Sequence, residues 1–372
     1  MRDFSDCRRI VVKIGTNVLT RDEQLDVEYV RQIALDLASI RSPQRQLLLV
    51  TSGAIGMGAR EIGATPPVRQ IAMRQACAAV GQPLLMNTYR AAFSSHDIKV
   101  AQVLLTREVL NNRKSYLNLR NAVETLLSLD ILPIINENDS VSTAEIGTAF
   151  GDNDQLSALV ASKTDADLLI MLSDIDALYT SDPRTNADAR PVPVVEALND
   201  EVRASAGGAG SSFATGGMHT KLLAVGIAER AGCRVVLAHG REPQLIPRVL
   251  AGEEIGTLFL SRDRLSNRER WILNSAARGS IEVDNGALAA VCKRNSLLPT
   301  GVISVRGAFE AGAVVELRTP GSEKARAKLV TSLGSTDLRA VMGRHSSEIA
   351  AILGVGKKAL IARPEEIVLI DR

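Results

Sequence analysis

Lys13 and Lys221 each stand beside glycines in segments that could bind phosphate. Lys13 comes near the end of the apolar run 10–15, and the backbone amides of Gly15 and Thr16 follow it. A charge in a buried run is costly unless it has a partner. Lys13 is therefore either a lysine whose ammonium reaches solvent at a strand end or a ligand for an anion, and the residue alone leaves both interpretations open.

The segment 213–232 places Gly216 and Gly217 just before a predicted helix and Lys221 in its early part. Helix N-terminal amides plus one lysine form a phosphate cradle. A glycine that merely caps the helix fits the pattern too, and the P-loop sequence GxxxxGK[ST] is absent.

A third segment has Ser52 followed by Gly53, Gly56 and Gly58 after the apolar run 47–52. Small residues let a bound group approach the backbone. A tight strand-to-helix turn would explain the glycines equally well, so this segment alone is weak evidence for a site.

Two polar clusters, NEND at 136–139 and GDND at 151–154, lie close together in the sequence. Asn and Asp are common in turns and mean little singly. Because both clusters flank apolar runs and the second leads directly into a helix, they favour a site. Carboxylates there would bind an ammonium group and orient cationic phosphate ligands.

These residues together suit phosphoryl transfer to a carboxylate. A carboxylate is a competent nucleophile near neutral pH, so no strong general base is needed, and catalysis reduces to positioning and charge neutralisation. Two lysines, glycine-loop amides and Mg²⁺ would supply that neutralisation. The pattern predicts an enzyme that uses ATP and a small carboxylate-bearing metabolite.

The elements that must position these residues alternate between strand and helix. Apolar runs rich in Val, Ile and Leu predict buried strands of a mostly parallel sheet at 10–15, 47–52, 100–105, 131–136, 167–172 and 234–239. Amphipathic stretches predict helices at 27–40, 68–93 and 117–129. We therefore expect an α/β fold, a three-layer sandwich whose ligands collect at the carboxyl ends of the strands.

The pattern changes at the polar segment 261–270, after which apolar runs are shorter and turn residues denser. This change is typical of a compact β-rich module. We expect an α/β domain at 1–260, a linker at 261–275 and a small β-rich domain at 276–372.

Composition excludes several classes of protein. Hydrophobic residues make up 45% and charged residues 23% of the 372 residues, with a net charge of +2, which is typical of a globular protein that does not seek polyanions. The four cysteines form no CxxC pair, so neither a zinc site nor a disulfide framework is expected. No segment approaches membrane-spanning length, and we expect a cytoplasmic protein.

Several motifs, in this order, resemble the amino acid kinase family, and within it the group that phosphorylates glutamate. They are KIGT at 13–16, TSGAI at 51–55, INEND at 135–139, AEI at 144–146, GDND at 151–154, SDIDALYTSDPR at 173–184 and TGGMHTK at 215–221. The last third of the chain resembles the PUA domain. The resemblance implies ATP-dependent phosphorylation of the side-chain carboxylate of L-glutamate to L-glutamyl 5-phosphate, the first step of proline biosynthesis.

The resemblance also implies roles for individual residues. Lys13 and Lys221 would contact the ATP phosphates and stabilise the transferring phosphoryl group, while Asp154 would hold the lysines in place. Glutamate would be bound by Ser52, Asp139 and Asn153. The nucleotide would be surrounded by Lys13, Ser173, Asp174, Thr215, Gly216, Gly217, Met218, His219, Thr220 and Lys221.

The sequence departs from the family pattern at a few positions. Ser173 and Ala177 stand where Thr and Gly are more usual, and the loop at 146–151 looks slightly longer than is common. These departures concern nucleotide contacts and loop geometry rather than the activity.

Partners follow from the same resemblance. Proline, the end product, is expected as a feedback inhibitor, glutamyl phosphate reductase as a partner, and a homo-oligomer as the assembly. RNA is a further candidate because PUA domains often bind it. Residues 271–372 carry 14 Lys and Arg against 10 Asp and Glu, with Trp271 and Phe309 as their only aromatic residues. RNA binding is therefore not favoured.

Acetylglutamate kinase and aspartokinase are the nearest alternatives within the family. The NEND and GDND clusters and the PUA-like tail argue against both. The ACT-like regulatory modules of aspartokinase have no visible counterpart in the sequence.

Overall fold

The computed structural model describes residues 2–21, 24–64, 68–141, 153–205, 217–261, 265–353 and 360–370. Contacts divide the chain into two compact units, Met1–Arg264 and Leu265–Arg372. Within the described ranges, no helix is both long and apolar enough to cross a membrane.

In the described part of the first unit, eight strands form one sheet in the order β5-β6-β4-β1-β7-β9-β10-β8. Neighbouring strands run parallel except β9 and β10. The strands are β1 (Arg9–Ile14), β4 (Gln46–Val50), β5 (Val100–Leu105), β6 (Leu132–Glu137), β7 (Leu168–Ser173), β8 (Val194–Val195), β9 (Arg234–His239) and β10 (Thr257–Phe259), besides a hairpin of β2 (Thr20–Arg21) and β3 (Gln24–Leu25).

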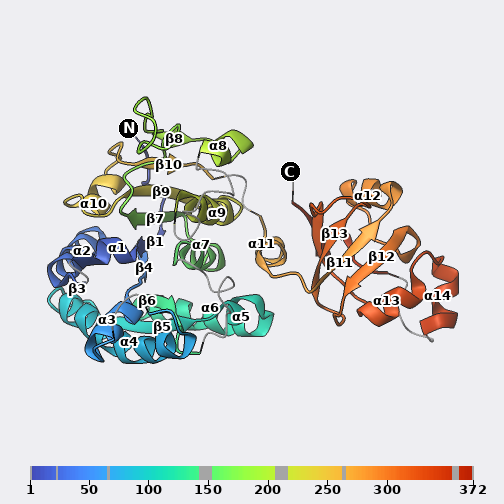
Figure 1. The fold of residues 1–372 in the computed structure, drawn as a ribbon, viewed down its shortest axis with the longest axis horizontal. Coiled ribbons are helices and arrows are strands. Elements are labelled where there is room, and N and C mark those ends of the chain that lie inside the picture. Colours follow the sequence, from blue (N-terminus) through green and yellow to red (C-terminus); the bar gives the residue numbers. More distant parts are fainter. Residues whose placement is uncertain are drawn as a thin grey trace. The chain divides into compact units, whose positions relative to one another are not determined.

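Helices cover both faces of this sheet and complete the three-layer sandwich (Figure 1). Helices α2, α4 and α10 share one core with the sheet, and α6, α7 and α9 share the other. The helices are α1 (Thr16–Leu19), α2 (Val27–Ile40), α3 (Ala54–Glu61), α4 (Ile71–Ser94), α5 (Arg107–Asn111), α6 (Arg113–Ser128), α7 (Asn153–Lys163), α8 (Asp200–Ser205), α9 (Met218–Glu229) and α10 (Leu245–Leu250).

The alternation along β1 decides where its lysine points. Ile10, Val12 and Ile14 belong to the core with α2, whereas Val11 belongs to the core with α7 and α9. Because successive side chains of a strand point to opposite faces, Lys13 lies on the same face as Val11. Its side chain is therefore directed to the layer that contains α7 and α9.

The expected fold class is confirmed, and all six predicted strands are present within two residues of their predicted limits. Helix α2 has the predicted limits, while α6 begins four residues earlier than predicted, at Arg113. The side chain of Asn112 caps this helix by accepting a hydrogen bond from the backbone amide of Ser115. The polar first turn carries no apolar periodicity, so only the cap marks the true start.

The second unit has a five-stranded sheet in its described residues, ordered β12-β11-β13-β14-β15. All its neighbouring pairs are antiparallel except β11 and β13. Its elements are α11 (Asn267–Asn274), β11 (Gly279–Val283), α12 (Asn285–Cys292), η1 (Pro299–Gly301), β12 (Val302–Gly307), β13 (Val314–Arg318), β14 (Ala327–Val330), α13 (Ser335–Val341), α14 (Ser346–Leu353), η2 (Pro364–Glu366) and β15 (Ile367–Leu369).

Helix α11 lies inside the segment 261–275 that the sequence analysis assigned to a linker. A capping box between Ser266 and Glu269 starts this helix, and Ile272 is buried against Val314 and Val368 of the small sheet. The part of that segment in the second unit is therefore ordered and packed. The exact domain limits stay a prediction.

Candidate active site

Three charged side chains meet beneath the carboxyl ends of the central strands. Lys13 Nζ on β1 lies 2.5 Å from Asp154 Oδ1, and Lys221 Nζ on α9 lies 3.1 Å from Asp154 Oδ2. Asp154 is fully buried, and the lysines are 2% and 3% exposed. The structure thus brings together all three residues that the sequence analysis named as catalytic.

In this cluster two ammonium groups contact the two oxygens of one carboxylate. Ions this deeply buried are tolerated when they are paired. Asp154 stands in the first turn of α7, and Lys221 in the first turn of the adjacent α9. Two ammonium groups close to two helix N-termini make this a place for an anion.

The first turn of α9 contributes backbone amides to the same region. Its N-cap is Gly217, which has no side chain to bond these amides. The hydroxyl of Thr220 donates to the Gly217 carbonyl and so does not bond them either. Met218 and His219 complete the turn before Lys221. Thr215 and Gly216, also predicted to bind nucleotide, lie outside the described residues.

Ser173 and Asp174 stand at the end of β7. Ser173 is buried and its hydroxyl donates to Asp174 Oδ1 over 3.0 Å, while Asn17 Nδ2 donates to Asp174 Oδ2 over 2.7 Å. Burial alone would raise the pKa of Asp174, but these hydrogen bonds outweigh it and hold the pKa below its usual value. Asp174 is therefore an ionised carboxylate at neutral pH.

Within the described residues, no three His, Cys, Asp or Glu side chains form a cluster that could hold a metal ion alone. Mg²⁺ commonly binds through one or two carboxylates, several waters and the phosphates of a nucleotide. The ionised carboxylate of Asp174 fits that mode of binding.

A cavity of about 210 Å³ opens beside this cluster. That volume suits a small metabolite, being below the range of drug-sized ligand pockets. The segments that follow β1, β4 and β6 contribute to its wall, together with the first turns of α4 and α7. The lining residues are Thr16, Ser52, Gly53, Ala54, Ile55, Gly56, Arg74, Asn136, Glu137, Asp139 and Asn153.

Glycine occupies each of the three positions after β4 for a different physical reason. Gly53 has a φ of +97°, a left-handed conformation that favours glycine. A Cβ on Gly58 would lie 1.7 Å from the carbonyl oxygen of Cys77 on α4, so Gly58 permits close helix packing. A Cβ on Gly56 would meet nothing within 4 Å. Gly56 faces open space in the cavity wall and is the glycine that leaves room there.

All three residues predicted to bind substrate line this cavity. The side-chain amide of Asn153 donates to Ser52 Oγ over 2.9 Å, to Asn136 Oδ1 over 3.0 Å and to the backbone carbonyl of Thr51. Asp139 is partly buried, and burial raises the pKa of its carboxyl, an effect that the guanidinium of Arg74 partly offsets. The cavity lining therefore includes two acidic residues, Glu137 and Asp139, and one basic residue, Arg74.

Sequence reasoning missed two residues of the site. Arg74 stands in the first turn of α4, where only helical periodicity was considered, and Asn17 stands in α1 after Gly15. Asn17 lies in the glycine-marked segment after β1, so that pattern could have identified it, whereas Arg74 belongs to no such segment and only the tertiary structure reveals it. The longer loop at 146–151 and Asp152 lie outside the described residues.

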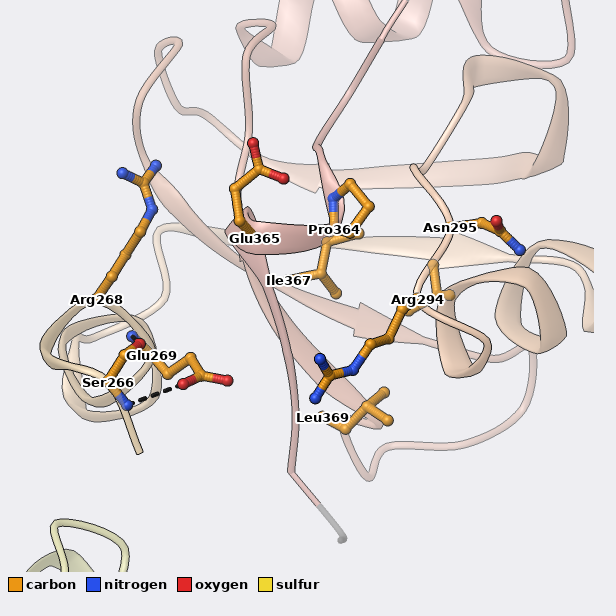
Figure 2. A pocket seen from close by; sticks show the side chains of 10 residues that line it. Ser266, Arg268, Glu269, Arg294, Asn295, Pro364, Glu365, Ile367 and Leu369 are labelled. Carbon is orange, nitrogen blue, oxygen red and sulfur yellow. Dashed lines mark hydrogen bonds between the residues drawn. The ribbon is translucent and has the colours of Figure 1, made fainter. Parts of the chain in front are cut away.

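A second cavity, of about 380 Å³, lies within the second unit between α11, the end of α12 and β15. Figure 2 shows the side chains of Arg294 and Glu269 pointing toward each other across it, with Ile367 above and Leu369 below Arg294 in this view. None of the residues predicted to be catalytic or to bind substrate lines it.

The model of the family described as "Amino acid kinase family" matches residues 8–239, which include every residue of the charged cluster and the first cavity. The chain belongs to the amino acid kinase family. The PUA domain model matches residues 279–353 of this family member, within the second unit.

Relatives of this amino acid kinase match over nearly its whole length. A protein of Methanosarcina barkeri named glutamate 5-kinase is 45% identical, with 99% of this chain and 98% of the relative covered. One of the same name from Geobacter sulfurreducens is 44% identical, with 94% of each covered. The Giardia lamblia carbamate kinase bound to AMP-PNP shares the fold, with a TM-score of 0.50 and 15% identity over 70% of this chain and 100% of its own.

Proposed function

We propose that this amino acid kinase is a glutamate 5-kinase, which transfers the γ-phosphoryl group of ATP to the side-chain carboxylate of L-glutamate and forms L-glutamyl 5-phosphate. The observation that carries the proposal is the position of the Lys13–Asp154–Lys221 cluster beside a small cavity whose lining includes both acidic side chains and the basic side chain of Arg74. The names of full-length relatives at 43–45% identity support the same activity.

The two lysines act on the transferring group. Negative charge spreads over the oxygens of the γ-phosphoryl during transfer, and cations fixed beforehand stabilise that charge at no cost of reorganisation. Asp154 touches both ammonium groups and so sets their separation. We infer that Asp154 positions the lysines and takes no proton, because the attacking carboxylate is already ionised.

ATP would lie along the first turn of α9 and the end of β7. The amides of Gly217, Met218, His219 and Thr220 would face phosphate oxygens, together with the segment that begins at Thr215 and Gly216. Ser173 and Asp174 would lie on the other side of the nucleotide. Asp174 would help to hold Mg²⁺, which when bound adds positive charge to the phosphates.

Glutamate would occupy the cavity between α3, α4 and α7. Asp139 would pair with its ammonium group, and Ser52 and Asn153 would supply neutral hydrogen bonds. Arg74, whose side chain is exposed at the cavity, would pair with the α-carboxylate. The side-chain carboxylate would then be free to point toward the lysine cluster.

Proline would be a competitive inhibitor at this cavity. It shares the α-carboxylate and a positively charged α-nitrogen with glutamate, so contacts from Ser52, Asp139 and Asn153 can be reused, but it lacks a side-chain carboxylate. A ligand that shares these contacts must lower the apparent affinity for glutamate, and the inhibition should shrink as glutamate rises.

The remaining partners follow from the chemistry of the product. An acyl phosphate is reactive toward water, so glutamyl phosphate reductase is proposed as the enzyme that receives it. We also propose a homo-oligomer and a cytoplasmic location, the latter because all four cysteines are free in the structure.

A coupled assay of ADP release tests the activity. ADP release should depend on L-glutamate and should be absent with L-aspartate and with N-acetylglutamate, since the first is one methylene shorter and the second lacks the ammonium group. Release with N-acetylglutamate but not with glutamate would contradict the proposal.

A further inference from the structure

The cavity of the second unit has opposite charges that face each other without forming a pair. Glu269 on α11 and Arg294 after α12 point toward each other across this cavity of about 380 Å³ (Figure 2). Among the residues that the structure describes, none accepts a hydrogen bond from the Arg294 guanidinium or forms an ion pair with it. A molecule that carries both charges could therefore bind between the two side chains.

Arg294 is an unusual residue for its backbone position. The end of α12 has the hydrogen bonds of a Schellman motif, from the Arg294 amide to the Val291 carbonyl over 2.9 Å and from the Asn295 amide to the Ala290 carbonyl over 3.0 Å. Arg294 has a φ of +60° there, in the left-handed region where glycine is the usual residue and a side chain is strained. Because the Arg294 side chain is also exposed, its presence indicates a role other than the stability of α12.

Glu269 is held on the opposite side by the first turn of α11. Its Oε2 accepts a hydrogen bond from the Ser266 backbone amide over 2.9 Å, and the Ser266 hydroxyl accepts one from the Glu269 amide over 3.3 Å. This capping box fixes the direction of the Glu269 side chain. A carboxylate has lone pairs for several donors, so Glu269 can bind an ammonium group as well.

The other two charged residues of the lining have neighbours of opposite charge. Arg268 Nη2 lies 2.8 Å from Glu366 Oε1, and Glu365 Oε1 lies 3.8 Å from Arg363 Nη1. The lining therefore has no excess of one sign. An anion without a positive group would face the Glu269 carboxylate, and a cation without a negative group would face the Arg294 guanidinium.

The rest of the lining includes apolar side chains. Val291 belongs to the hydrophobic core of the small sheet, and Ile367 and Leu369 pack against that core. All three also line the cavity, whose volume lies in the range of small-molecule sites. A ligand that covers these side chains removes apolar surface from water.

We propose that this cavity binds the zwitterion of an amino acid with a branched apolar side chain. Its α-carboxylate would pair with the guanidinium of Arg294, which can form two parallel hydrogen bonds. Its ammonium group would pair with Glu269, and its side chain would cover Ile367 and Leu369. This site is separate from the proposed glutamate cavity, and the inference assigns the ligand no effect on phosphoryl transfer.

Equilibrium dialysis of the full chain with radiolabelled L-leucine tests the site. The Asp139→Ala variant is used as the background, because it weakens the binding of α-amino acids to the first cavity. Leucine should bind saturably, at one site per chain, below about 10 mM. Competition by 4-methylpentanoate, which lacks the ammonium group, and by 3-methylbutylamine, which lacks the carboxylate, should be at least about 10-fold weaker.

Arg294→Gly is the decisive variant, because glycine suits the left-handed backbone. Its thermal unfolding midpoint should stay the same or rise, while its affinity for leucine should fall about 10-fold or more. Glu269→Gln keeps an acceptor for the capping box and should lower the affinity by a similar factor. Lys293→Gln is the matched control, since it removes a neighbouring exposed cation that does not line the cavity, and it should leave the affinity unchanged.

The inference is overturned if leucine does not bind saturably, or if it binds folded Arg294→Gly as tightly as the background protein. Competition by 4-methylpentanoate as strong as that by leucine itself would show a site for carboxylates alone and would also overturn it. None of these outcomes bears on the proposed function, which the assay of ADP release tests separately.

Discussion

The two halves of the site use different kinds of interaction. On the phosphate side, Lys13, Asp154 and Lys221 are buried ions, two ammonium groups in contact with one carboxylate. On the amino-acid side, Asn153 is neutral, and its side-chain amide donates to Ser52 Oγ and Asn136 Oδ1. The first arrangement acts on charge that changes during the reaction, and the second on groups that do not change.

This difference separates catalysis from selection. A fixed ionic field stabilises the transition state more than the ground state, so its loss should appear in kcat. Groups that bind unreacting parts of the substrate bind both states alike, whether they are neutral amides or the charged side chains of Asp139 and Arg74, so their loss should appear in KM. Each prediction below tests whether a given variant changes kcat or KM as this separation requires.

The largest effect is expected for Lys13→Ala and Lys221→Ala. Each removes a cation that faces developing negative charge, and by analogy with the loss of one oxyanion donor kcat should fall by about 10²–10³-fold or more. The KM for glutamate should change little. Steady-state kinetics of both variants provide the test, with Lys99→Ala as a surface control. Near-normal turnover in folded Lys13→Ala and Lys221→Ala proteins would remove the phosphate role.

Asp139→Ala should raise the KM for glutamate by about 10–100-fold and leave the KM for ATP almost unchanged, because a hydrogen bond between charged groups is lost. Burial raises the pKa of Asp139, and Arg74 partly offsets this effect. Protonation removes the charge that pairs with ammonium, so the wild-type KM for glutamate should rise as pH falls, beginning at a higher pH than for an ordinary aspartate.

That pH dependence should be absent in the Asp139→Ala variant and present in Asp188→Ala, a control at an exposed aspartate. A glutamate KM that is the same in Asp139→Ala as in the wild type would end the assignment of Asp139 to the substrate.

Arg74→Gln should raise the KM for glutamate about 10-fold, as for one surface-accessible charged hydrogen bond. Binding of 4-aminobutyrate, which has the ammonium group and the side-chain carboxylate but no α-carboxylate, should be unaffected. Competition assays with both compounds measure this, and Arg90→Gln is the control on the same helix. If Arg74→Gln weakens the binding of both compounds equally, Arg74 acts through the overall electrostatic potential of the cavity and does not pair with the α-carboxylate.

The smallest effect is expected when the second unit is removed. Both hydrophobic cores of the first unit consist of residues up to Phe259, so a chain that ends at Ser261 should keep its kcat, its KM values and its inhibition by proline within about twofold. Inhibition curves at several glutamate concentrations check this. Intact catalysis with lost proline inhibition would assign the regulation to the second unit.

Local sequence patterns identified the charged cluster more completely than they identified the residues that line the cavity. Lys13, Asp154 and Lys221 belong to short motifs at the ends of predicted elements, so their types and positions could be found in the sequence. Arg74 stands in one long helix, and no local pattern distinguishes it from the other polar residues of α4. Its place in the cavity lining depends on how α4 is rotated and packed, which is a property of the tertiary structure.

The contact between α3 and α4 has a consequence for the tolerance of this chain to mutation. A Cβ on Gly58 would lie 1.7 Å from the Cys77 carbonyl oxygen, and a Cβ on Gly81 would lie 1.8 Å from that of Ala54. Each helix thus presses its glycine against the backbone of the other, and no rotamer change could relieve either clash. During the evolution of this protein, neither glycine can therefore be replaced by a single substitution, although neither residue is placed at the substrate or the nucleotide.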